Sequence, residues 1–188
     1  MSLKELHARK VGSINGVSLI KLDMSFKNLF GPLGPERHVT LHWTAGPCDD
    51  SVEEAVRLCR SYHSYHASKG WGGIGYHYGL CRTAPAILLL RPVTLKGAHV
   101  GGWNTGNVGV MTHAGAGGKE DRNPTQHQVD AFTVLLRYAH TKKFPAAHRT
   151  DRKLARPYCE RRGHNDWPGH EWNSCPGTSR PLLNLRTK

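Results

Sequence analysis

The stretch VTLHWTA, residues 39–45, places His42 in a run of apolar and β-branched side chains. A short run of this kind predicts a buried β-strand, here over residues 38–45. Further strands and helices follow it in alternation along the chain. This alternation predicts an α/β fold with a central, mostly mixed β-sheet flanked by helices, because the apolar faces of a sheet must be covered.

The elements beyond this strand are marked by capping and turn residues. A helix to about residue 68 follows the N-capping residues 49–51. Thr125 begins a second amphipathic helix, which is predicted to run to about residue 142. Strands are predicted over residues 74–80, 86–91 and 108–112, and a short closing helix over residues 179–185.

The length of the chain, 188 residues, is enough for one well-buried core and too short for two domains. Residues 1–37 are expected to form an N-terminal basic extension with one hairpin, because Asn15-Gly16 is a turn signal before the strand-like residues 17–20. Residues 38–188 are expected to form a single globular domain. We expect this domain to be a monomer.

The net charge of +12 predicts an anionic partner or a basic solvated surface. Residues 141–188 carry 11 Lys and Arg against 4 Asp and Glu, so this C-terminal region holds +7 of the total. Nucleic acid, a membrane surface and anionic cell wall polymers would all be attracted by this charge. Nucleic acid is not expected, because the chain has neither zinc-finger spacing nor a base-reading motif.

No apolar run approaches the roughly 18 residues that a membrane span requires. The longest, residues 86–90, is the size of a strand. The first residues lack the apolar core of a secretory signal peptide, so the chain is expected to stay in the cytoplasm where it is made. Four of the five cysteines are interpreted as reduced thiols, and Cys175 is set apart by the motif around it.

Three residues far apart in the sequence form a possible metal-ligand set. His42 lies in the first strand described above, whereas His164 and Cys175 lie in GHNDW (163–167) and CPG (175–177). Two imidazoles and one thiolate leave the fourth position of a tetrahedral zinc site for water, as in catalytic sites. A structural site would usually have four protein ligands at short spacings, and the chain has no CxxC pair. Taken singly, none of the three residues is specific.

The order of four motifs makes the combination specific. HWTA (42–45), GWGGIGYHY (70–78), GAHVGGWNTGNVGV (97–110) and GHNDW followed by SCPG (163–177) resemble, in this order, the zinc-dependent N-acetylmuramoyl-L-alanine amidases of type 2. These amidases share a fold with peptidoglycan recognition proteins and many phage endolysins. The resemblance covers about residues 38–180. It implies the amidase fold of peptidoglycan recognition proteins, Zn²⁺ as cofactor and peptidoglycan as partner.

The resemblance also implies roles for individual residues. It makes His42, His164 and Cys175 the zinc ligands. Tyr76 matches a tyrosine that points toward the metal, where a phenol would orient water or stabilise the tetrahedral intermediate. The residues expected to bind substrate are His99, Trp103, Asn104 and Thr105.

One position departs from the family pattern. Two residues before the metal cysteine, relatives often carry Lys or Thr, to which transition-state stabilisation is assigned, whereas this chain has Asn173. An amide can donate a hydrogen bond to an oxyanion but cannot supply a proton as an ammonium can. We therefore predict a catalytic role for Asn173, with His170 of the same loop as the alternative.

The function implied is hydrolysis of the amide bond between N-acetylmuramic acid and L-alanine by a zinc-activated water, during phage-induced lysis of the host. The enzyme would be held in the host cytoplasm before its release to the cell wall. Two alternatives remain open. One is a cytoplasmic amidase that recycles muropeptides, and the other is a peptidoglycan-binding module without activity, against which Cys175 argues because such modules usually lack the metal cysteine.

Overall fold

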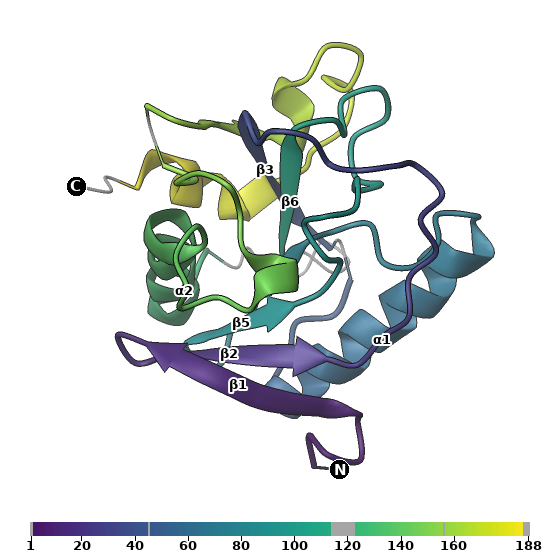
Figure 1. The fold of residues 1–188 in the computed structure, drawn as a ribbon. Helices are drawn as coiled ribbons and strands as arrows, with labels where there is room; N and C mark the ends of the chain where they lie inside the picture. The colour runs from purple at the N-terminus through teal and green to yellow at the C-terminus, as the bar shows by residue number, and fades with distance from the viewer. Residues whose placement is uncertain (1, 45, 114–122, 156, 186–188) are drawn as a thin grey trace.

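The computed structural model describes residues 2–44, 46–113, 123–155 and 157–185. Its centre is a seven-stranded sheet in the order β1-β2-β5-β4-β6-β3-β7 (Figure 1). The strands are β1 (Ala8–Ile14), β2 (Val17–Leu22), β3 (His38–Trp43), β4 (Tyr78–Leu80), β5 (Ala86–Leu89), β6 (Asn107–Thr112) and β7 (Glu160–Gly163). The strands β4, β6, β3 and β7 run parallel, whereas β1 and β2, and β4 and β5, pair antiparallel. The predicted mixed α/β sheet is therefore confirmed.

Two α-helices cover opposite faces of this sheet, α1 (Val52–Ser68) and α2 (Gln126–Tyr138) (Figure 1). The alternation of side chains along β5 divides the core between them. Ile87 and Leu89 join the cluster of α2, and Leu88 joins the cluster of α1. The remaining helical pieces are the 3-10 turns η1 (Ala146–His148), η2 (His164–Asp166) and η3 (Gly177–Asn184).

Both predicted helix starts are confirmed by their caps. The side chain of Ser51 accepts a hydrogen bond from the backbone N–H of Glu54 at 3.1 Å. Thr125 and Gln128 form a capping box at the start of α2. This second helix ends at Tyr138, earlier than predicted, because the chain turns there and Thr141 Oγ1 donates to the carbonyl oxygen of Tyr138 at 2.8 Å.

The N-terminal hairpin belongs to the main sheet. Asn15 and Gly16 have φ values of 50° and 82°, as a two-residue hairpin turn requires, and β2 pairs in parallel with β5. The sheet therefore continues across residue 37, where the sequence predicted a boundary. The domain division itself stays a prediction.

Two predicted strands are shorter in the structure. The strand predicted over residues 38–45 ends at Trp43, and Ala45 lies outside the described residues. The strand predicted from residue 74 begins only at Tyr78. Gly72 and Gly73, which lie before the predicted strand, have φ values of 70° and 118°, which an extended strand does not accommodate, and residues 74–77 are not part of a strand. No helix within the described residues is long and apolar enough to cross a membrane.

Candidate metal centre

The sheet register brings the two predicted histidine ligands together. Strands β3 and β7 are parallel neighbours in which Leu41 pairs with Gly163, so His42 and His164 follow side by side at the carboxyl edge of the sheet. Their ring centroids lie 4.8 Å apart. Cys175 comes from the loop before η3 and places its Sγ 3.6 Å from Nδ1 of His42. The ligand atoms of the three residues all lie within 4.8 Å of one another.

The cysteine loop is organised by Asn173. The Oδ1 atom of Asn173 accepts from the backbone N–H of Cys175 at 2.9 Å, and its Nδ2 donates to the carbonyl oxygen of His170 at 2.7 Å. The backbone N–H of Trp43 points at the Sγ atom of Cys175 from 3.3 Å. Asn173 thereby shapes the turn that carries the thiol, a role that the sequence did not suggest.

The donor set fits a divalent metal ion. Burial raises the pKa of the Cys175 thiol to about 12, against a smaller opposing effect of the Trp43 N–H, so a thiolate here requires a nearby cation. Burial lowers the pKa of His42 well below its ordinary value and that of His164 to about 4. Both imidazoles are therefore neutral near pH 7, which is the form that binds a metal.

Each of the two candidate histidine ligands lies against a second histidine. Nε2 of His42 lies 3.1 Å from Nδ1 of His99, whose own Nε2 lies 3.1 Å from the carbonyl oxygen of Asn107. Nε2 of His164 lies 3.1 Å from Nδ1 of His170, whose Nε2 lies 3.0 Å from the carbonyl oxygen of Gly101.

A carbonyl oxygen only accepts, so the outer imidazole of each chain must donate from Nε2 and accept at Nδ1. Each inner imidazole then donates from its own Nε2 and keeps Nδ1 free. The two relays therefore leave Nδ1 of His42 and of His164 as the nitrogen atoms that a metal could bind. His99 and His170 thus have partners at both ring nitrogens and orient the rings of His42 and His164.

Of the three candidate ligands, His164 lines a pocket of about 410 Å³. Tyr76 lines it, with its ring centroid 5.0 Å from that of His42. Burial raises the pKa of the Tyr76 phenol, which therefore stays a hydrogen-bond donor at neutral pH. The pocket is lined by Phe30, His66, Trp71, Tyr76, Ala98, His99, Val100, Gly101, Asn104, His164, His170 and Trp172.

The four residues expected to bind substrate fall into two groups. His99 and Asn104 line the pocket, and Oδ1 of Asn104 accepts from the backbone N–H groups of His99 and Val100 at 2.9 and 3.0 Å. Trp103 and Thr105 are exposed but do not line it. The indole of Trp103 stacks on Trp167 at 5.2 Å between centroids.

Sequence reasoning missed several lining residues. Phe30 comes from the segment before β3, and Trp172 comes from the cysteine loop with 81% of its surface exposed. A tryptophan directly before the predicted catalytic residue Asn173 was a usable signal in the sequence. Phe30 carried no local signal, because only the fold brings residue 30 to the pocket.

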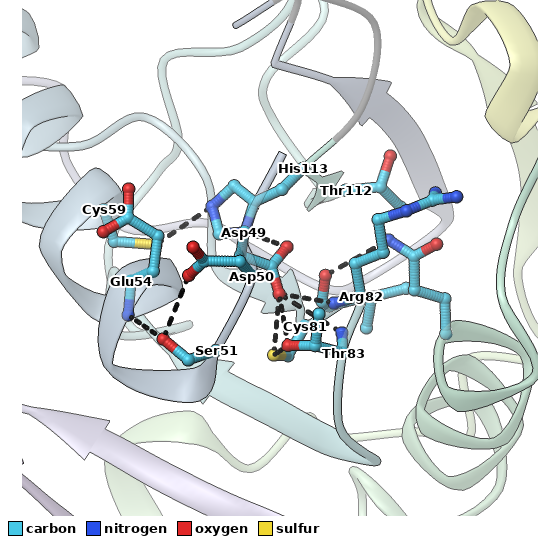
Figure 2. A network of polar contacts seen from close by, with 12 residues as sticks. Asp49, Asp50, Ser51, Glu54, Cys59, Cys81, Arg82, Thr83, Thr112 and His113 are labelled. Carbon is cyan, nitrogen blue, oxygen red and sulfur yellow. Dashed lines mark hydrogen bonds and ion pairs between the residues drawn. The ribbon is translucent and has the colours of Figure 1, made fainter. Parts of the chain in front are cut away.

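A second polar cluster lies beside the first turns of α1, and its polar side chains bind one another (Figure 2). Asp49 Oδ1 lies 3.1 Å from Nδ1 of His113, and the Nε2 atom of His113 lies 3.7 Å from Sγ of Cys59 on α1. Asp49 Oδ2 accepts from Sγ of Cys81 at 3.0 Å and from the backbone N–H of Arg82 at 2.8 Å. The side chains of Asp49 and His113 are fully buried. We call Asp49, Cys59, Cys81 and His113 the closed cluster.

Fold and site together define a class, an α/β protein with a candidate mononuclear metal centre of two histidines and one cysteine at an open pocket. The family model described as N-acetylmuramoyl-L-alanine amidase matches residues 32–178. The chain therefore belongs to this amidase family, which confirms the resemblance inferred from the four motifs.

Two curated relatives are phage proteins. The endolysin of Klebsiella phage KP32 is 33% identical over 79 residues, which are 41% of this chain and 52% of that protein. The endolysin of Enterobacteria phage K11 is 32% identical over 79 residues, with the same coverage of both chains. This chain thus spans about half the length of the curated relatives it matches.

Solved structures share the fold at low identity. The Drosophila protein PGRP-SD superposes with a TM-score of 0.65 at 19% identity, covering 98% of this chain and 93% of that one. The N-acetylmuramoyl-L-alanine amidase LysC from Clostridium intestinale superposes with a TM-score of 0.58 at 20% identity, covering 85% and 88%. These likenesses confirm the predicted peptidoglycan-recognition-protein-like fold.

Proposed function

We propose that this chain is a zinc-dependent peptidoglycan hydrolase that cleaves the amide bond between N-acetylmuramic acid and L-alanine. The observation that carries the proposal is the convergence of His42, His164 and Cys175 within 4.8 Å beside an open pocket, in a chain that belongs to the amidase family. A three-ligand set of this kind keeps one position for water or substrate. Membership of the family supplies the substrate class.

The chain's own residues would hold the metal and orient the groups that bind it. His42, His164 and Cys175 would be its ligands, and the relays through His99 and His170 fix which ring nitrogen each histidine presents. When bound there, Zn²⁺ supplies Lewis acidity toward an amide carbonyl and lowers the pKa of water to about 7.

Tyr76 is proposed as the hydrogen-bond donor to the developing oxyanion. It lines the pocket beside His42, and burial keeps its phenol protonated. A neutral donor held in a partly desolvated site stabilises negative charge that appears in the transition state. The alternative within this proposal is that the phenol orients the attacking water.

Asn173 is proposed as a second, weaker donor. One N–H of its Nδ2 atom binds the carbonyl oxygen of His170, which leaves the other N–H available. His170 is the poorer candidate for a general acid, because both of its ring nitrogens already have partners. The departure from the family pattern would then affect rate more than reaction type.

The biological role proposed is lysis of a bacterial host at the end of phage growth. The similarity to two phage endolysins supports it. The enzyme would wait in the host cytoplasm and would act as a monomer. The basic residues of the C-terminal region, of which residue 156 and residues 186–188 lie outside the described part, would attract anionic cell wall polymers.

Mass spectrometry of peptidoglycan digests tests the proposal directly. We expect intact cell walls to release stem peptides that begin with a free L-alanine amine, and chelation of zinc to stop the release until zinc is restored. Cleavage of released muropeptides only would indicate a recycling amidase. Binding to cell walls with no product would indicate a recognition module, and either result would contradict the proposed function.

A further inference from the structure

Arg91 carries a charge that is buried without a carboxylate partner. It follows β5, is 1% exposed, and takes part in none of the ion pairs formed among the described residues. Burial lowers the pKa of its guanidinium to about 10, so it remains cationic at neutral pH. A buried cation is tolerated only where hydrogen bonds replace its lost hydration.

Backbone carbonyl groups provide these hydrogen bonds. Nε of Arg91 donates to the carbonyl oxygen of Ile74 at 2.8 Å. Nη2 donates to the carbonyl oxygens of Trp71 at 2.6 Å and Gly73 at 3.0 Å. Nη1 donates to the carbonyl oxygen of Lys96 at 3.1 Å. The planar guanidinium therefore binds two separate loops, the loop of residues 71–77 and the loop that carries Lys96.

The loop of residues 71–77 needs a side-chain donor because it lacks the backbone hydrogen bonds of a helix or a strand. Residues 71–77 form neither helix nor strand, so several of their carbonyl groups have no partner from secondary structure. The backbone N–H of Arg91 also donates to the carbonyl oxygen of Tyr76 at 3.1 Å. Arg91 thus holds this segment at both of its ends.

The same two loops form walls of the pocket. Trp71 and Tyr76 lie at the ends of the first loop, and Ala98 follows the second. The backbone N–H of Ala98 donates to the carbonyl oxygen of Gly75 at 3.1 Å, which joins the two walls. The ring of Phe26 covers the guanidinium with its centroid 5.4 Å away.

We propose that Arg91 is a positioning residue of the pocket, whose buried guanidinium sets Trp71 and Tyr76 against the metal-ligand set by holding carbonyl groups of two loops. Its effect on turnover rests on the proposed amidase function, whereas its effect on loop geometry does not. Lysine cannot replace it, because an ammonium offers three protons from one point and not a planar fork of five.

The test compares Arg91→Lys with Phe132→Leu, a buried change in α2 away from the pocket. Hydrogen–deuterium exchange of the full-length, zinc-loaded protein is expected to be about 10-fold faster over residues 70–77 in Arg91→Lys. The same segment should keep its wild-type exchange in Phe132→Leu. We also expect kcat of Arg91→Lys to fall by ~10- to 100-fold with zinc content unchanged, because small misplacements of a catalytic donor are costly.

Wild-type exchange over residues 70–77, or wild-type kcat, in folded Arg91→Lys would overturn the proposal. If Arg91→Lys does not fold, Phe26→Leu removes the ring over the guanidinium and should accelerate exchange in the same segment, and no acceleration would count against the proposal. If the wild-type protein releases no peptide from cell walls, the amidase function fails. Faster exchange in Arg91→Lys would still support the positioning of the loops.

Discussion

Two groups of histidine and cysteine side chains lie at the carboxyl ends of the parallel strands, and they differ in what their polar atoms face. In the metal-ligand set, Nδ1 of His42 and the thiol of Cys175 converge beside an open pocket. In the closed cluster, His113 is hydrogen-bonded at both ring nitrogens, to Asp49 and to Cys59 of α1 (Figure 2).

The comparison shows that residue type does not decide function at this edge of the sheet. Both groups contain imidazole and thiol, and both are largely buried. The two groups differ in whether a carboxylate within the group accepts hydrogen bonds from its imidazole and thiol. In the closed cluster, the carboxylate of Asp49 accepts the hydrogen bonds of His113 and Cys81, and we expect such a paired buried network to stabilise the fold. In the other group, the relays engage Nε2 of His42 and of His164, and Nδ1 of each ring stays available for a metal.

The largest effect should come from losing a metal ligand. His42→Ala, His164→Ala and Cys175→Ala are each expected to lose zinc and to lower kcat/KM on the order of 10³-fold or more, because the metal supplies the main chemistry. Metal analysis and peptide release from cell walls measure this. The matched control is Cys59→Ala in the closed cluster, which should keep its zinc. Full activity in Cys175→Ala would break the comparison.

Tyr76→Phe should keep zinc and lose turnover by ~10- to 1000-fold, because only the donor to the oxyanion or water is removed. Steady-state kinetics on a soluble muropeptide measure it. Tyr78→Phe is the control two residues along, since the Tyr78 hydroxyl donates to the carbonyl oxygen of His148 in the core. It should cost stability and leave kcat unchanged. Wild-type turnover in Tyr76→Phe would make its phenol structural.

His170→Ala should weaken zinc binding by ~10- to 100-fold, because His164 loses the partner that orients its ring. Competition with a chelator of known affinity measures the change, and His127→Ala on the exposed side of α2 is the control. If His170 were the general acid, His170→Ala would lower kcat at constant zinc affinity. That result would contradict the proposal that His170 orients His164.

Asn173→Ala should lower kcat by about 10-fold with little change in KM, as expected for a donor used in the transition state. Zinc content, measured in parallel, separates this from a collapse of the Cys175 turn. Asn173→Lys should remain active, since relatives often carry Lys there. An inactive but zinc-loaded Asn173→Lys protein would show that this loop is arranged differently from the family pattern.

Asp49→Asn tests the other side of the comparison and should reduce stability by about 1–3 kcal/mol with kcat unchanged, because buried donors lose their acceptor. Burial alone would raise the pKa of Asp49, but hydrogen bonds from His113, Cys81 and Arg82 outweigh it and lower the pKa to about 2. The exposed Asp23→Asn, which loses a surface ion pair with Arg9, should cost less than about 1 kcal/mol.

The pH dependence follows from the sign of this shift. The folded pKa of Asp49 lies below the unfolded value of about 3.9, so its stabilisation is complete above that value. It is lost as the pH falls through about 2. Chemical denaturation between pH 2 and 6 should show a steeper acid loss in wild type than in Asp49→Asn. Parallel curves would mean that the carboxylate contributes no stability.

Much of the fold was predictable because its signals are local. The N-caps Ser51 and Thr125 and the turn Asn15-Gly16 act through hydrogen bonds and dihedral angles within a few residues. The strand predicted from residue 74 was wrong in its first residues for a non-local reason. The carbonyl oxygen of Ile74 binds the side chain of Arg91, and the carbonyl oxygen of Gly75 binds the backbone N–H of Ala98, so neither pairs with a neighbouring strand.

The sequence by itself determined the alternation of elements, the family and the three candidate metal ligands, because residue type and motif order carry that information. Only the tertiary structure decided what surrounds them. The relays through His99 and His170, the bracing of the Cys175 turn by Asn173 and the arrival of Phe30 at the pocket depend on which backbone groups meet across the sheet. Such meetings are set by strand register and packing, which act between residues far apart in the chain.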